Sequence, residues 1–398
     1  MVNHSTWKVY ILALVSFLVG TSEYIISGIL DQIAQTLGVS VAAAGQLITV
    51  FSLTYAIGTP ILMAITAQLD RRKLLLYALG LFIVANVLSF VLPGFGMFIA
   101  ARIVMALGAG IVVVTAMSIA TKIAAPGKQA SALATVIMGF TASLIIGVPI
   151  GRVVSSQFGW KAVFLGIALA GMLALIVLAL TIPRIKGDEP VPLRKQFALL
   201  ARPDVALGLG ITFFWLGGYS LAYTYISPYL LEVSKLNESL LSVALLVFGI
   251  SSLIGSKTGG YSADKRGVAF TLIGGMTLHI ISLILLTMAH SAVSIFTFLI
   301  LWSFAAWTTG PTQQYNLASL VPESSGVMLS LNQSTMQLSM AVGAGLGGVL
   351  IEQVSLASVT WFAALGVAIA AVGVVILSRM LSDRSSHISS VSKSTTHD

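Results

Sequence analysis

An acidic residue, Glu23, stands inside an apolar run from Val9 to Leu30. A run of this length crosses a bilayer core of ~30 Å as a helix, so the carboxylate would lie in hydrocarbon unless another group receives it. Arg102 stands in another such run, 96–121. With a rise of 1.5 Å per residue, Glu23 lies ~22 Å from one surface and Arg102 ~9 Å from the other. Their depths are similar, and the two side chains could meet.

The pair of Glu23 and Arg102 has two interpretations. A fixed ion pair would hold two helices in register, whereas a proton carrier would gain and lose its proton as the conformation changes. We favour proton coupling for both residues, because a static pair has no evident reason to lie off the midplane. The second half of the chain lacks an equivalent pair, so we expect contacts with a bound small molecule, called the cargo below, mainly there. His279, alone in an apolar run, is expected to be packed and neutral.

Three aromatic residues, Trp215, Tyr219 and Tyr223, recur every four positions in the run 205–231 and so share one helix face. Aromatic residues often form a belt at the membrane surface. The middle members lie too deep for a belt, and a ring beside a planar ligand would stack on it. We therefore expect Tyr219 and Tyr223 to contact the cargo.

Several amide side chains lie in later apolar runs, where each must find a hydrogen-bond partner within the protein. Hydrogen bonds between helices are one explanation. Amides also donate to and accept from purine edges and sugar hydroxyls, so they are candidates for binding cargo. The candidates are Gln313, Asn332, Gln333 and Gln337, with Gln46, Trp302 and Trp307 weaker.

The composition is that of an integral membrane protein built from helices. The chain has 398 residues, of which 57% are hydrophobic and 9% charged, too few polar residues to cover a soluble surface. Apolar stretches of roughly twenty residues recur, the length of a helical span. We place spans at 8–30, 41–66, 73–93, 96–121, 130–153, 160–182, 205–231, 239–258, 268–289, 293–317, 325–350 and 355–378.

Several classes of function are excluded by what the sequence lacks. It has no cysteine, hence no disulfide or thiolate chemistry, and no phosphate-binding loop for ATP. The five histidines are dispersed, which disfavours a membrane-embedded hydrolase. The net charge of +8 comes from basic residues scattered among short loops, so nucleic acid is not an expected partner. We expect no metal and no cofactor.

The distribution of basic residues predicts the orientation. With the N-terminus inside, 17 of the 21 lysines and arginines fall on the cytoplasmic side, as the positive-inside rule expects. Both termini are then cytoplasmic. The chain divides into a six-helix bundle over 1–182, a cytoplasmic linker over 183–204, a second six-helix bundle over 205–380 and a disordered tail over 381–398.

The two halves carry related loops. "TAQLDRRK" after the second span and "GGYSADKRG" after the eighth each place an aspartate before a basic pair, Asp70 with Arg71 and Asp264 with Arg266. Two corresponding bundles are typical of transporters that rock about a central site. We expect these loops to act as conformational latches.

These motifs resemble the major facilitator superfamily, in its twelve-span drug:proton antiporter branch. "GGYSADKRG" is similar to the superfamily's loop signature, although the first copy has Thr66 in place of a glycine. "RIVMALGAG", which begins at Arg102, resembles the fourth-span motif. "GVPIG", with Gly147, Pro149 and Gly151, resembles the fifth-span motif of antiporters and is expected to form a gate or packing seam. Longer stretches resemble bacterial purine base and nucleoside efflux pumps and, less closely, sugar efflux transporters.

The resemblance implies an all-α fold of twelve spans and a proton-coupled exporter working by alternating access. Purine bases or nucleosides are the first candidates for cargo, with sugars or assorted drugs as alternatives. The expected partners are a small molecule, protons and the lipid of a bacterial cytoplasmic membrane, and the expected state is a monomer. The proton gradient is the expected source of energy.

Overall fold

The computed structural model describes residues 6–125, 129–187, 198–321 and 325–394, which are almost entirely helical and contain no strand. Twelve of the helices are long and apolar enough to cross a membrane. The predicted all-α fold and the twelve predicted spans are therefore confirmed. The largest difference is the eighth span, Glu238–Arg266, which extends eight residues beyond its predicted end at 258.

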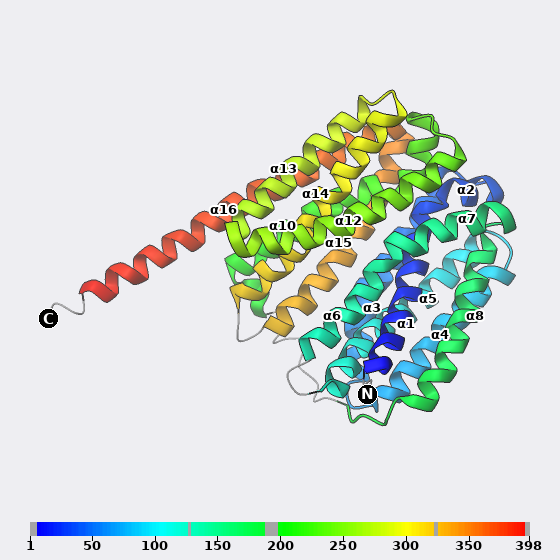
Figure 1. Cartoon of the computed structure of the whole chain (residues 1–398), viewed down its shortest axis with the longest axis horizontal. Helices are drawn as coiled ribbons and strands as arrows, with labels where there is room; N and C mark the ends of the chain where they lie inside the picture. The colour runs from blue at the N-terminus through cyan, green and yellow to red at the C-terminus, as the bar shows by residue number, and fades with distance from the viewer. Residues whose placement is uncertain (1–5, 126–128, 188–197, 322–324, 395–398) are drawn as a thin grey trace.

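The first bundle is built from α1 to α8 (Figure 1). Its fifth span is continuous but changes to a π-helix at η1 before α7. The bounds are α1 Thr6–Gly28, α2 Leu30–Leu37, α3 Val41–Ile65, α4 Arg71–Val91, α5 Phe95–Ile123, α6 Gln129–Ala142, η1 Ser143–Gly147, α7 Val148–Phe158 and α8 Lys161–Thr181.

The second bundle is built from α10 to α16. Its first span is followed by two short segments, the helix α11 and the π-helix η3. The bounds are η2 Leu199–Ala201, α10 Pro203–Thr224, α11 Ile226–Pro228, η3 Tyr229–Val233, α12 Glu238–Arg266, α13 Val268–Thr287, α14 Ala292–Leu320, α15 Ser325–Gln353, η5 Leu356–Ser358 and α16 Val359–Ser394.

Short polar side chains start several of these helices. The side chains of Ser40, Asp70 and Asn237 accept hydrogen bonds from backbone N–H groups in the first turns of α3, α4 and α12. Ser291 forms a reciprocal capping box with Ser294 at the start of α14. The first N–H groups of a helix lack partners within it, so such caps fix where each span begins.

The two bundles meet along two pairs of spans. α3 packs against α15, and α12 packs against η1 and α7. We call the end of the molecule where α2 contacts α11 the α2 side. Figure 1 shows α2 and α7 together at this end, where the second bundle also reaches them. The space there is filled by Tyr225, which packs against Gly45 of α3 and Gly347 of α15.

Glycines bring α1 close to the fifth span. A Cβ atom at Gly20 would lie 2.7 Å from the carbonyl oxygen of Phe140, and one at Gly139 would overlap the backbone of Ala13. Gly147 and Gly151 make room for the side chains of Thr21 and Ile25. Pro149 is buried in the first turn of α7. Small residues thus let these helices pack backbone to backbone.

The tail differs from its prediction. The middle of the predicted linker, 188–197, lies outside the described residues, as do residues 395–398. Up to Ser394, however, the predicted disordered tail is a continuation of α16. No glycine or proline follows Leu381, so nothing in the sequence interrupts the backbone hydrogen bonds of that helix.

Candidate functional site

Glu23 links the two bundles. It lies on α1 with 3% of its surface exposed, and its Oε1 accepts a hydrogen bond of 3.1 Å from Nε2 of Gln337 on α15. Its second oxygen, Oε2, has no hydrogen-bond partner among the described residues. Half of a buried carboxylate is thus left for a proton, water or ligand.

Arg102 lies near Glu23 but forms no ion pair with it in the described part of the chain. The two interact electrostatically. The guanidinium, fully buried, donates from Nη1 to the backbone oxygen of Ser22 at 2.8 Å and lies 4.1 Å from the centroid of the Phe51 ring. Ser22 directly precedes Glu23, so Arg102 holds the backbone that carries the acid. The two residues are therefore close together without forming the predicted direct pair. Equal depth in the membrane does not fix the direction in which a side chain points.

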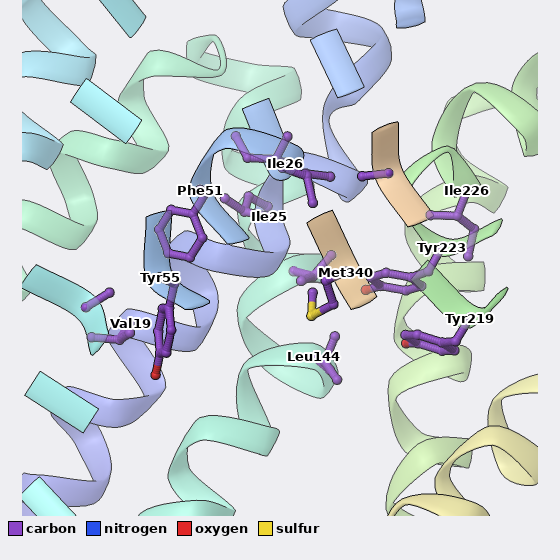
Figure 2. Packing of buried hydrophobic residues seen from close by; sticks show 14 of the residues in the cluster. Val19, Ile25, Ile26, Phe51, Tyr55, Leu144, Tyr219, Tyr223, Ile226 and Met340 are labelled. Carbon is purple, nitrogen blue, oxygen red and sulfur yellow. The ribbon is translucent and has the colours of Figure 1, made fainter. Parts of the chain in front are cut away.

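Tyr219 and Tyr223 form the centre of an aromatic cluster. Their rings are stacked, with centroids 5.2 Å apart and an interplanar angle of 12°. Tyr219 also contacts Trp302 and Trp307. Figure 2 shows both hydroxyls pointing from α10 toward Met340 and Leu144, that is, toward the first bundle. The predicted shared face is confirmed.

The cluster touches the first bundle at Tyr24. This residue follows Glu23 on α1, and its ring contacts Tyr223 edge-on with centroids 6.5 Å apart. It also contacts Phe140 of α6. Glu23 and Tyr24 are neighbours on α1. The acid and the ring that contacts the aromatic cluster of the second bundle thus lie side by side at the boundary between the bundles.

Unpartnered polar atoms gather around this boundary. They are buried but make no hydrogen bond within the described residues, although Tyr219 and Trp307 face each other. Buried polar groups nearly always have partners, and a set without them is typical of a place that holds water or ligand. The atoms are Glu23 Oε2, Tyr55 Oη, Tyr219 Oη, Trp307 Nε1 and Gln337 Oε1.

The amide candidates separate into two groups. Gln333 and Gln337, one turn apart on α15, face Tyr55 and Glu23 of the first bundle. Asn332 is also buried on α15 and contacts Met336. Gln333 and Gln337 thus lie at the boundary between the bundles, whereas the described contact of Asn332 stays within α15.

Gln313 is different, because its amide is already used. Nε2 donates to the backbone oxygen of Gly208 at 2.8 Å and to Thr212 at 3.1 Å, and Oε1 accepts from Asn316 at 3.2 Å. These contacts join α14 to α10 within the second bundle. The structure thus supports helix packing for Gln313, and we leave it out of the proposed site.

His279 is held as a packed neutral ring, as expected. Trp302 donates from Nε1 to His279 Nε2 at 2.7 Å. A ring nitrogen that accepts a hydrogen bond carries no proton, so the proton of the neutral ring is on Nδ1. The ring of His279 also contacts Tyr219, so this histidine packs against the aromatic cluster.

The two aspartates of the repeated loops have different surroundings. Asp70 caps α4, accepting from Lys73 N at 2.9 Å, and its other oxygen accepts from the backbone N–H of Ile185 at 3.0 Å. It ties the end of the first bundle to the start of the linker. Asp264 is exposed near the end of α12, and Arg266 lies 5.4 Å from the centroid of the Phe270 ring. Arg71 is buried beside Asp70.

Replacing Asp70 by alanine should lower stability by about 1 kcal/mol, the usual loss when a helix cap is removed. Asp264→Asn, in contrast, should leave stability unchanged and slow transport with little change in cargo affinity, as expected of a latch that pairs in another conformation. Thermal unfolding of both variants, with Asp264→Asn also assayed for transport, checks this. Equal losses of affinity and rate in Asp264→Asn would contradict the latch.

Sequence reasoning missed a buried ionic cluster on the α2 side. Arg152 of α7 is fully buried and binds both oxygens of Asp31, with Nη1 at 2.6 Å and Nη2 at 2.9 Å. It also binds Glu238 of α12 and donates to the backbone oxygen of Gly28. Asp31 belongs to the first bundle and Glu238 to the second. Hydropathy does not reveal this cluster, because the partners of Arg152 lie in α2 and α12, 121 and 86 residues away in the sequence.

A third contact closes the same side. Ser227, after α10, donates a hydrogen bond of 2.7 Å to the backbone oxygen of Ser27 on α1. With Arg152 and Tyr225, it joins the bundles beyond the level of Glu23. The molecule is therefore closed on its α2 side.

Two six-helix bundles with an acid, an aromatic cluster and free polar atoms between them define a membrane transporter. The chain belongs to the Major Facilitator Superfamily, whose family model matches residues 12–344. It is 68% identical over 367 residues to the "Uncharacterized MFS-type transporter YbcL" of Bacillus subtilis (strain 168), covering 92% of this chain and 94% of that protein. A second relative in that organism, the "Uncharacterized MFS-type transporter YtbD", is 30% identical over 381 residues, covering 94% of this chain and 95% of that protein.

Solved structures support the fold. A D-xylose-proton symporter matches with a TM-score of 0.76 and 16% identity, over 93% of this chain and 97% of that chain. A bacterial homologue of the human lysosomal transporter Spinster, in its inward-facing and occupied conformation, matches with a TM-score of 0.75 and 19% identity, over 95% and 98%. At these identities the likeness concerns the fold alone.

Proposed function

We propose that this transporter exports small planar organic molecules in exchange for protons, with purine bases and nucleosides as the first cargo class. The observation that carries the proposal is the position of Glu23, a buried acid with one free oxygen at the boundary between the two bundles. An ionisable residue inside a membrane is costly and usually marks an ion or proton pathway. No other acid of the described spans combines burial with a contact across the boundary at this depth.

The cargo class rests on the aromatic cluster and the amides. The stacked rings of Tyr219 and Tyr223 offer a flat apolar surface, and Asn332, Gln333 and Gln337 offer donors and acceptors near it. Planar heterocycles with N–H and C=O edges match both features. The one carboxylate of the described spans that could bind a permanently cationic cargo is Glu23, and in the proposed exchange this carboxylate binds the proton.

Alternating access supplies the cycle. On the orientation expected from the basic residues, the α2 side faces outward, so the closed state receives cargo from the cytoplasm. Opening this side requires Glu238 to leave Arg152 and Ser227 to leave Ser27, after which cargo departs and Glu23 takes a proton from outside. The return closes the α2 side and delivers the proton inward.

Transport into inside-out vesicles tests the proposal. We expect radiolabelled hypoxanthine and adenosine to accumulate only when the lumen is acid, with arabinose and a cationic dye not accumulating. Accumulation of arabinose or the dye instead would change the cargo class, and accumulation without a gradient would exclude proton coupling. Vesicles from cells without the protein serve as the control.

Tyr219→Ala should reduce purine binding by about five- to tenfold, since one stacked ring contributes ~1 kcal/mol. Tyr219→Phe keeps the ring and should change binding little. Competition by purine, nucleoside and sugar against labelled hypoxanthine measures this. Identical competition profiles in wild type and Tyr219→Ala would remove the ring from the cargo site.

A further inference from the structure

Gln337 makes the hydrogen bond that joins Glu23 to the second bundle. Each of these two side chains has one oxygen without a hydrogen-bond partner among the described residues. Its Nε2 donates to Glu23, while its own Oε1 and Glu23 Oε2 have no partner in the described residues. The side chain of Gln337 is 2% exposed. The amide orientation follows from the chemistry, because an ionised carboxylate only accepts hydrogen bonds and must face the NH₂ group.

A protonated Glu23 reverses this requirement. It carries an O–H donor, which needs an acceptor, and the acceptor already within reach is Oε1 of the same amide after the amide turns over. Leaving a buried donor without a partner costs ~1–3 kcal/mol, enough to enforce the change. The ionised acid therefore leaves the amide oxygen free, and the protonated acid occupies it.

We propose that Gln337 couples proton and cargo: its amide oxygen accepts an N–H or O–H donor of the cargo while Glu23 is ionised, and accepts the Glu23 proton otherwise. Cargo and proton thus exclude each other at one oxygen atom without binding to the same group. The inference rests on the proposed exchange of cargo for protons. It places the residue that links proton binding to cargo binding, Gln337, in the second bundle. The cargo it requires has a hydrogen-bond donor, as purine bases have.

The other groups around Glu23 only donate, are bound to other residues, or make no hydrogen bond to the carboxylate within the described residues. Arg102 of α5 only donates, and Arg152 of α7 is bound to Asp31 and Glu238. The titratable groups that interact with Glu23 are otherwise the hydroxyls of Tyr24 on α1 and Tyr55 on α3. Tyr219 and Tyr223 of α10 face Tyr24 rather than the acid. Gln337 is the side chain that bonds the carboxylate directly.

The first test needs no cargo. Because the chain has no cysteine, spin labels can be attached at two introduced cysteines, one on each bundle at the α2 side, and the distance between them followed from pH 5 to 9. We expect wild type to change its distance distribution with pH, and Gln337→Leu to lose most of that change. Ser339→Ala, which removes a buried hydroxyl bonded within α15, should retain it. A Gln337→Leu variant with the full wild-type response would overturn the proposal.

The second test uses purified protein and labelled hypoxanthine. We expect wild type to bind it more tightly as pH rises, and Gln337→Leu to bind it at least tenfold more weakly at high pH and with little dependence on pH. Gln337→Leu with wild-type pH dependence would again overturn the coupling role. If wild type binds no hypoxanthine at any pH, the proposed cargo fails, while the distance measurement still decides the role of Gln337.

Discussion

Glu23→Gln should abolish concentrative transport, bringing the ratio of internal to external cargo in acid-lumen vesicles to one. Glutamine resembles the protonated acid in shape and polarity but cannot release a proton, so the cycle cannot use the gradient. Its amide can still bond Gln337 across the bundles, so the fold should be retained. Uptake of labelled hypoxanthine with and without a gradient measures the effect.

Counterflow separates coupling from folding in this variant. Exchange of labelled for unlabelled cargo needs no net proton movement, so Glu23→Gln should still perform it when cargo is concentrated enough to compete with the glutamine NH₂ group for Gln337 Oε1. Glu352→Gln, which changes an exposed acid at the end of α15, is the matched control and should accumulate cargo as wild type does. A Glu23→Gln protein that still concentrates cargo would show that another group carries the proton.

Arg152→Gln should release the α2 side. Asp31, with 16% of its side chain exposed, then loses its bidentate partner, so the cost should be below the ~3–5 kcal/mol of breaking a fully buried ion pair. The loss falls on the closed conformation, in which Asp31 and Glu238 both bind this arginine. Glu238→Gln should have a smaller effect, since that side chain is 59% exposed and leaves Arg152 bound to Asp31.

A single cysteine at Ser27 reports this opening. Its side chain is buried between the bundles in the closed state, so an impermeant maleimide added to whole cells should react slowly. In Arg152→Gln the reaction should be at least tenfold faster, and in Lys161→Gln, which loses a contact within the first bundle, it should be unchanged. Equal rates in all three proteins would show that Arg152 does not hold this side closed.

The spans could be predicted because the membrane imposes their length and composition on each segment independently. The shared face of Tyr219 and Tyr223 followed from helix periodicity for the same local reason. The partners of Glu23 could not be predicted, since depth along a helix says nothing about which neighbour a side chain faces. Gln337 lies 314 residues from Glu23, and only the packing of α15 against the first bundle brings them together.

Gln313 and Arg152 also show that the partners of a buried polar residue cannot be predicted from the sequence. Both are polar residues in apolar runs; the sequence pattern assigned Gln313 to cargo binding and gave Arg152 no role. The structure gives Gln313 three partners within its own bundle and Arg152 a role between bundles. Whether a buried polar group is structural or functional depends on which atoms remain unpartnered, and that is a property of the folded chain.

The contact between α1 and the fifth span has a consequence for speed. At Gly20 and Gly139 the helices come within backbone contact, so few side chains have to change rotamer when one helix slides along the other. Interlocked side chains would add an activation barrier to each such movement, whatever the energies of its end points. In the proposed cycle we therefore expect these glycines to affect how quickly α1 moves between conformations, and Arg152 and Gln337 to affect how long each conformation lasts.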